Sequence, residues 1–127
     1  MKGTELRPGN YVLDVTSNEH KLVYGVSHVE DFDVAYVQYK NEFDQPATFL
    51  IQPIELTQEW LRKFGFKRRK NQNRYHWENK IVIMEFSDGG FMTYTGYDIR
   101  YSPMLEHVHQ LQNLYYTLTG KELILTP

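Results

Sequence analysis

A β-hairpin is predicted by residues 80–95, which read KIVIMEFSDGGFMTYT. Two runs of β-forming residues flank an Asp-Gly-Gly sequence, and such residues suit tight turns whose backbone needs positive φ. The first run divides into two alternating sets that point to opposite faces of a strand: Ile81, Ile83 and Glu85, and Val82, Met84 and Phe86. Because both sets are largely apolar, we expect one face of the sheet to be covered and the other to be only partly exposed.

The hairpin is expected to extend into a meander on both sides. A Glu78-Asn79 turn joins it to the preceding residues, and a further β-forming run follows it. These segments predict a four-stranded antiparallel sheet, with strands at 74–77, 80–86, 91–95 and 97–101. Residues 123–125, Leu-Ile-Leu, are expected to return as an edge strand.

A long amphipathic helix supplies the cover that this sheet needs. Ser102 is expected to cap the helix, with Pro103 at its first position and Gly120 at its end. One apolar stripe at helical spacing faces the sheet: Val108, Leu111, Leu114, Tyr115 and Leu118.

A second, shorter helix is predicted within residues 56–65, LTQEWLRKFG. Thr57 is a good N-terminal cap, and Gly65 is well placed for the left-handed position after the last turn. Arg62 and Lys63 lie in the last turn, where cations interact favourably with the helix dipole. Trp60, Leu61 and Phe64 share one face, which we expect to pack on the sheet.

Residues 1–54 predict a separate small β lobe. Four short, closely spaced strands at 11–15, 22–29, 34–39 and 47–51 are typical of an SH3-like half-barrel, and Gly25 marks a bulge or a tight bend. The fold class is therefore α+β: the SH3-like lobe, a short helix, then the four-stranded meander covered by the C-terminal helix. We expect residues 1–127 to form one domain with two lobes, 1–54 and 55–127.

Composition excludes several classes of function. The chain has no cysteine, so thiolate catalysis, disulfides and cysteine-ligated metals are ruled out. No apolar run approaches the roughly 20 residues of a membrane span, and no signal peptide is evident, so we expect a cytoplasmic protein without membrane contact. His107 and His109 diverge by about 200° on a helix and cannot share a metal. With no catalytic motif, the sequence predicts a non-enzyme without cofactor or metal.

Charge is segregated along the chain. Eight of the fourteen lysines and arginines lie between Arg62 and Lys80, a band with one acid, whereas residues 1–61 carry ten acids and four bases. Arginine pairs bidentately with phosphate, and aromatic rings stack on bases. The candidate ligand-binding residues, expected on a loop that leads into a strand, are Lys67, Arg68, Arg69, Lys70, Arg74, Tyr75 and Trp77.

An alternative interpretation of this band is a solvated hairpin with Trp77 in the core. Strand alternation places Tyr75 and Trp77 on one face and Arg74 and His76 on the other, so only part of the band can face one partner. A second candidate pocket lies on the C-terminal helix, where polar residues flank the apolar stripe: His109, Gln112, Asn113 and Tyr116. The alternative is that these four satisfy backbone groups or face water.

Three segments carry a resemblance: ELRPGNYV at residues 5–12, LTQEWLRKFGF at 56–66 and HQLQNLYYTLTGKEL at 109–123. Together and in this order they resemble small uncharacterised proteins of phages, prophages and mobile elements of anaerobic gut bacteria. The resemblance implies an accessory protein acting inside an infected or lysogenic host. It brings no established activity, so no catalytic residue is carried over.

Three functional hypotheses follow from these patterns. The first is a non-enzymatic protein that binds an anionic small molecule, such as a nucleotide signal of the host that it sequesters. The second is an inhibitor that binds a host protein through the basic patch or an exposed sheet edge. The third, nucleic-acid binding, is disfavoured by the sequence pI of about 6.2 and by the acidic flanks. Edge strands in both lobes also make a symmetric homodimer a candidate assembly.

Overall fold

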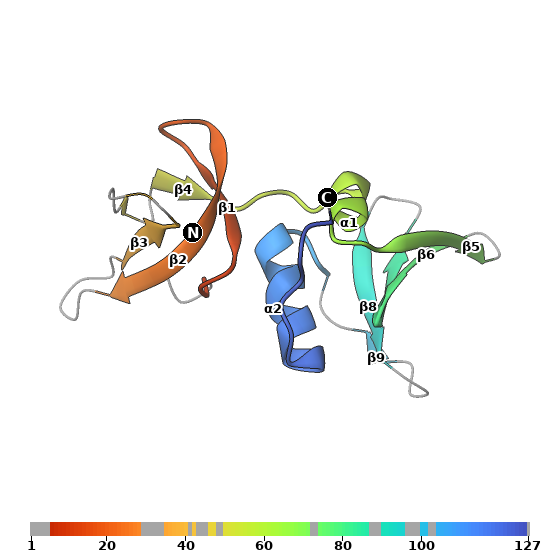
Figure 1. Cartoon of the computed structure of the whole chain (residues 1–127). Coiled ribbons are helices and arrows are strands. Elements are labelled where there is room, and N and C mark those ends of the chain that lie inside the picture. The colour runs from red at the N-terminus through yellow and green to blue at the C-terminus, as the bar shows by residue number, and fades with distance from the viewer. Residues whose placement is uncertain are drawn as a thin grey trace. The chain divides into compact units, whose positions relative to one another are not determined.

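The computed structural model describes residues 6–28, 35–40, 42, 46–47, 50–71, 74–86, 90–95, 100–101 and 104–126. The chain divides into two compact units, Met1–Ile54 and Glu55–Pro127. Each unit contains one antiparallel sheet, and the second also contains the helices, so the α+β class is confirmed (Figure 1). That the chain is a single domain stays a prediction.

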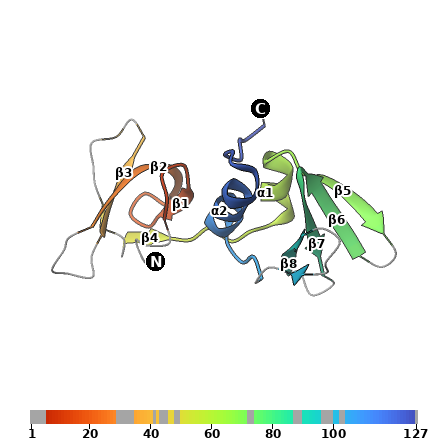
Figure 2. The same cartoon turned by 90° about the horizontal axis from the view of Figure 1, so that it is seen from below.

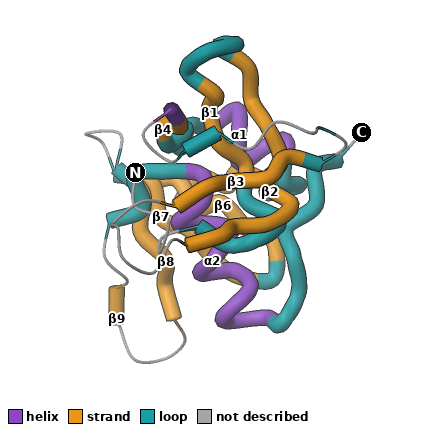
Figure 3. The backbone as a smooth tube through the Cα atoms, turned by 90° about the vertical axis from the view of Figure 1, so that its left-hand side faces the viewer, coloured by secondary structure: helices purple, strands orange, loops and turns teal. Residues whose placement is uncertain are grey.

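The unit Met1–Ile54 contains a four-stranded sheet in the order β3-β2-β1-β4. The strands are β1 (Tyr11–Asp14), β2 (Glu19–His28), β3 (Ala35–Tyr39) and β4 (Ile51–Gln52). β1 and β2 form a hairpin whose connecting turn, drawn in teal in Figure 3, contains Asn18 at a φ of 55°. The register of β2 against β3 shifts between Val23 and Gly25, which confirms the predicted irregularity at Gly25.

The predicted strand at 47–51 is much shorter in the structure. Ile51 begins β4, and Ala47 makes only an isolated bridge with Tyr36. The predicted ends Val29 and Val34 lie outside the described residues.

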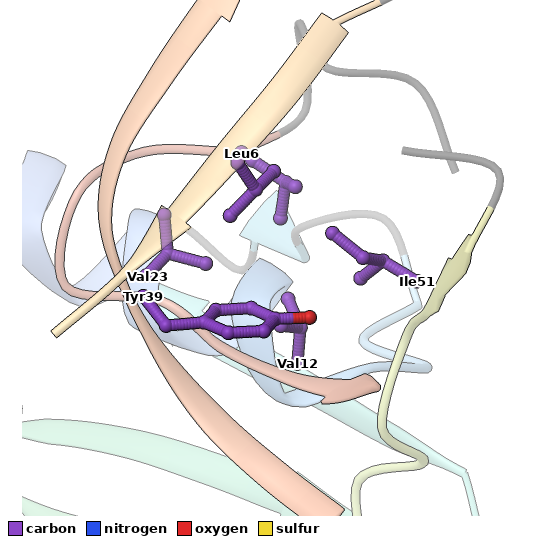
Figure 4. Close-up of a cluster of buried hydrophobic side chains, with 6 residues drawn as sticks. Leu6, Val12, Val23, Tyr39 and Ile51 are labelled. Carbon is purple, nitrogen blue, oxygen red and sulfur yellow. The ribbon is translucent and has the colours of Figure 1, made fainter. Parts of the chain in front are cut away.

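The core of this unit is a cluster of six buried residues: Leu6, Val12, Val23, Val37, Tyr39 and Ile51. Figure 4 labels five of these side chains, one from the segment before β1 and one from each of the four strands. Asp14 is buried beside the cluster, where its Oδ2 accepts a 2.5 Å hydrogen bond from the Tyr39 hydroxyl and its Oδ1 accepts from the Ser17 amide at 2.9 Å. The hydrogen bond from Tyr39 holds the pKa of Asp14 below its ordinary value. The pKa of Tyr39 is raised, mainly because its hydroxyl is buried and secondly because it is hydrogen-bonded to the Asp14 carboxylate.

The unit Glu55–Pro127 contains a five-stranded meander in the order β5-β6-β7-β8-β9. Its strands are β5 (Lys67–Asn71), β6 (Arg74–Asn79), β7 (Ile81–Glu85), β8 (Phe91–Thr95) and β9 (Arg100–Tyr101). The sheet gains its fifth strand because the basic segment, expected as a loop, pairs with β6 from Lys67 opposite Glu78 to Asn71 opposite Arg74. The predicted turn at Asp88 and Gly89 and the residues 97–99 lie outside the described residues.

The short helix α1 (Gln58–Lys63) has both predicted caps. The Thr57 hydroxyl accepts from the Trp60 amide at 3.4 Å, and Gly65 has a φ of 83°. Distant residues satisfy the last carbonyls, since the Thr126 amide donates to Lys63 at 2.6 Å and the Asn79 side chain donates to Phe64 at 3.0 Å. The predicted strand at 123–125 is wrong, because these residues form no strand, and the residue that follows them, Thr126, donates to the end of α1.

The helix α2 (Val108–Thr119) begins later than the sequence predicts. His107 is its N-cap, and Gly120 closes it at a φ of 71°, as predicted. The residues before it are extended, because the Leu105 amide donates to Phe91 at 2.8 Å and the Leu56 amide donates to Glu106 at 2.9 Å. The predicted cap at Ser102 and Pro103 lies outside the described residues.

Both helices lie on the same side of the five-stranded sheet (Figures 1 and 2). The stripe of α2 buries Val108, Leu111 and Tyr115, whereas Leu118 is 46% exposed. The fully buried apolar side chains in this unit come from α1 and the residue that caps its end, from two strands and from α2: Leu61, Phe64, Trp77, Ile83, Val108 and Leu111. None of the helices in the described residues combines the length and apolar character that crossing a membrane requires.

Candidate functional site: a basic edge strand

β5 forms one edge of the five-stranded sheet (Figure 1) and presents four consecutive exposed cations. Among the described residues, β5 pairs only with β6. Because side chains alternate along a strand, Arg68 and Lys70 lie on one face of the sheet, whereas Lys67 and Arg69 lie on the other. The basic band is therefore a two-faced edge, not a loop.

Arg68 is held against an aromatic ring. Its guanidinium carbon lies 3.6 Å from the centroid of the Tyr75 ring, on the neighbouring strand and the same face. A guanidinium that stacks on a ring keeps its N–H groups in its own plane, where they remain available to a carboxylate or a phosphate. Tyr75 thus fixes the position of Arg68 before any ligand binds.

The opposite face of β5 is partly neutralised within the chain. Arg69 Nε lies 3.4 Å from a carboxylate oxygen of Glu78, its neighbour on β6. In the part of the chain that the structure describes, Lys67, Arg68 and Lys70 form no ion pair. On the face that carries Arg68 and Lys70, both cations are thus free of ion pairs with described residues.

Trp77 is fully buried, so it cannot serve as the stacking platform that the sequence predicted. Its indole N–H donates to Glu85 Oε1 at 3.2 Å. The guanidinium carbons of Arg62 and Arg68 lie 5.3 and 5.8 Å from the Trp77 ring centroid. The alternative interpretation, in which Trp77 belongs to the core, is correct for this residue.

The two remaining residues of the predicted site, Arg74 and Tyr75, both lie in β6. Arg74 is opposite Asn71, and its side chain is not among those that the structure describes. Tyr75 is half-buried, and Arg68 covers one face of its ring. The structure therefore brings together Arg68, Lys70 and Tyr75, and it gives Tyr75 the role of positioning an arginine instead of stacking on a base.

Sequence reasoning did not assign a role to Glu85, which is buried on this same face, opposite Tyr75 on the neighbouring strand. Gln58 Nε2 lies 2.8 and 2.6 Å from its two oxygens, and Arg62 donates to the Gln58 carbonyl oxygen at 3.4 Å. These hydrogen bonds give both oxygens of the buried carboxylate a donor, and they link the end of β7 to α1. The sequence does contain a sign of this buried acid, because strand alternation places Glu85 on the same face as the apolar residues Ile81 and Ile83.

The four residues of the second candidate pocket differ in burial. His109 and Gln112 are buried, whereas Tyr116 is 44% exposed, so they do not share one exposed surface. Asn113 is half-buried between them. The argument that His107 and His109 diverge fails, because His107 lies before the helix and the two rings stack at 5.7 Å.

A surface pocket of about 280 Å³ lies elsewhere in this unit, beside the segment that precedes α2. None of the residues that line it was predicted from the sequence as a site residue. The lining consists of Glu55, Leu56, Gly90, Phe91, Met104, Leu105 and Glu106. Within the described residues, no group of three or more side chains could hold a metal ion. No protein-family model, curated protein or solved structure matches the chain.

Proposed function

We propose that this chain is a non-enzymatic binding protein that captures a multiply charged anionic ligand at β5. The observation that carries the proposal is a run of four exposed cations on an edge strand, one of which is stacked on Tyr75. Cations this close repel one another, and an anion that contacts several of them relieves the repulsion. Because exposed ion pairs are individually weak, the ligand needs more than one negative charge.

A nucleotide signal of the host is the small-molecule candidate. Its phosphates match the planar donors of Arg68 and the ammonium of Lys70, two residues further along the same face. The base of the nucleotide should add little to the affinity, because Trp77 is buried and Arg68 covers one face of the Tyr75 ring. Affinity should therefore follow the number of phosphates and not the identity of the base.

The biological role that fits this ligand is sequestration. The resemblance to phage and mobile-element proteins supports a setting in the cytoplasm of an infected or lysogenic host. There, a protein that binds the nucleotide without converting it lowers the free concentration of the signal.

Thermal unfolding with a panel of linear and cyclic nucleotides tests the proposal. We expect stabilisation that exceeds that of inorganic phosphate and rises with phosphate number. The Arg68→Ala/Lys70→Ala double variant should lose the effect, and Tyr75→Leu should weaken it without changing the charge. Lys121→Ala, at an exposed lysine in the same unit, is the matched control and should retain it. Nucleotide shifts no larger than those with phosphate alone would remove the nucleotide as the ligand of β5.

The second candidate function is inhibition of a host protein, and the edge position of β5 favours it. An edge strand offers backbone groups that a partner strand can pair with. Capture from nuclease-treated host lysate tests it: a stoichiometric protein that stays bound in high salt supports inhibition. If a nucleic acid is captured instead, its affinity should fall steeply as salt is raised.

For the unit Met1–Ile54 we propose an SH3-like half-barrel. Its four short antiparallel strands support this assignment, as does the irregularity in β2 at Gly25, since such irregularities bend strands. An experimental structure in which this sheet is flat would contradict it.

A further inference from the structure

We propose that the ligand of β5 is an extended acidic segment of another protein, which adds to the sheet as a sixth strand. This inference rests on the proposed function, because it identifies the chemistry of the anion that β5 binds. It also predicts which acids in the partner matter and how its backbone takes part.

The backbone of β5 is available for strand addition. In an antiparallel ladder, the N–H and C=O groups of alternate residues point toward the partner strand, and those of the residues between point away. Among the described residues, β5 has β6 on one side only, so alternate residues of Lys67–Asn71 direct their groups outward. An extended peptide can pair with these groups, whereas a nucleotide has no matching repeat.

The side chains of β5 determine the composition of the added strand. Residues of adjacent strands stand opposite one another on the same face, and opposite charges there stabilise the pair. Lys67, Arg68, Arg69 and Lys70 are all exposed, so both faces of the added strand favour acids.

The two faces do not make equal demands. Arg68, fixed on Tyr75, offers a planar pair of donors to one carboxylate, and Lys70 offers a second cation two residues along. On the other face, Arg69 is already paired with Glu78. The preferred segment therefore has two acids separated by one residue, and the residue between them is less restricted.

A second copy of the chain is a poor occupant of this edge. Pairing two β5 strands would place a basic run against an identical basic run, and like charges directly opposite one another are destabilising. Charge complementarity therefore favours a partner of opposite sign. The symmetric dimer predicted from edge strands stays a prediction for the other edges.

The test uses the full chain and a synthetic peptide in which glutamates alternate with valine or threonine. Two further versions carry N-methyl groups on the odd or on the even residues, which removes alternate backbone donors and leaves the charge unchanged. Isothermal titration should show that one methylated version loses at least about tenfold in affinity while the other keeps it. A peptide of the same composition with its glutamates adjacent should bind more weakly than the alternating one.

Variants of β5 assign the faces. Arg68→Glu/Lys70→Glu should abolish binding of the alternating peptide, and a peptide with lysines in place of the glutamates should bind this variant, which also shows that it is folded. Lys67→Glu/Arg69→Glu, the matched variant on the other face, should have a smaller effect.

The outcomes separate this inference from the proposed function. If both methylated peptides bind as well as the parent, strand addition is overturned while anion binding stands. If nucleotides stabilise the chain and no acidic peptide binds, the proposal of an acidic protein segment as the ligand is overturned, while the proposed anion binding stands. If neither nucleotides nor acidic peptides bind, both proposals fail.

Discussion

The carboxylate of Asp14 is buried in the unit Met1–Ile54 and depends on the hydroxyl of Tyr39. Because this hydrogen bond lowers the pKa of Asp14 in the folded state, its stabilisation is present above the ordinary pKa and is lost as pH falls through the lowered value. Tyr39→Phe should therefore cost about 1–3 kcal/mol at pH 7 and much less at pH 2. Urea unfolding at both pH values measures this.

Tyr24→Phe is the control for that substitution, because Tyr24 is 64% exposed and in the same unit. It should change the free energy of unfolding little at either pH. An equal cost of Tyr39→Phe at pH 7 and at pH 2 would contradict the assigned role of the Asp14 charge.

Lys80 turns the chain between β6 and β7 with a φ of 57°, a conformation unfavourable for most side chains. Lys80→Gly removes that penalty, although glycine gives up more backbone entropy on folding. We expect a net gain of about 0.5–1 kcal/mol in the free energy of unfolding, measured by chemical denaturation. Lys67→Gly, in the strand β5, should instead lower stability. A similar loss from both substitutions would show that the backbone at Lys80 is not strained.

At the scale of elements, α1 is a six-residue helix that relies on contacts at its end. Gly65 has a φ of 83°, and a Cβ there would lie 3.2 Å from Thr126 Cγ2. We expect Gly65→Ala to lower the free energy of unfolding by about 1–3 kcal/mol, measured by chemical denaturation.

Two variants separate backbone strain from crowding at Gly65. Gly120→Ala has a similar φ of 71° with no atom within 4 Å of the new Cβ, so it should show the backbone cost alone. Thr126→Ser removes the crowding methyl group and keeps the hydroxyl, so it should reduce the cost of Gly65→Ala. If both glycine substitutions lower the free energy of unfolding equally, the Thr126 side chain moves away from the new Cβ without an energetic cost.

What the sequence predicts best are features set by local chemistry. The caps of α1, the end of α2 at Gly120 and the irregularity at Gly25 each depend on one or two neighbouring residues. The start of α2 was misplaced because Leu105 pairs with Phe91, a contact that no local pattern reveals. β5 was missed for a related reason, since four cations have little β propensity and pairing with β6 makes the strand.

The candidate site was predictable in composition but not in geometry. The charge of the band is visible in the sequence, and alternation correctly grouped Tyr75 with Trp77. Alternation could not show that Trp77 is buried or that Tyr75 holds Arg68, because both depend on the elements packed around the strand.

At the scale of the whole molecule, each unit has its own buried core, and both tryptophans lie in Glu55–Pro127. Ile51→Ala opens a cavity in the core of Met1–Ile54 and should cost that unit about 2–5 kcal/mol. We expect the circular-dichroism transition to move to lower denaturant while the tryptophan fluorescence keeps its midpoint. A common shift in both signals would show instead that the chain unfolds as the single domain that its sequence predicts.

The hydrogen bond from Thr126 to the Lys63 carbonyl also has a consequence for biosynthesis. Chains fold from the N-terminus as they are made, at about 5–20 residues per second. The unit Met1–Ile54 has all of its strands once residue 54 has emerged from the ribosome, but the Lys63 carbonyl at the end of α1 gains its Thr126 donor only when residue 126 follows. From the completion of β5 at residue 71, the basic edge strand therefore spends about 3–11 seconds of translation before Thr126 is made, which is when a nascent chain most needs charges that discourage pairing with its neighbours.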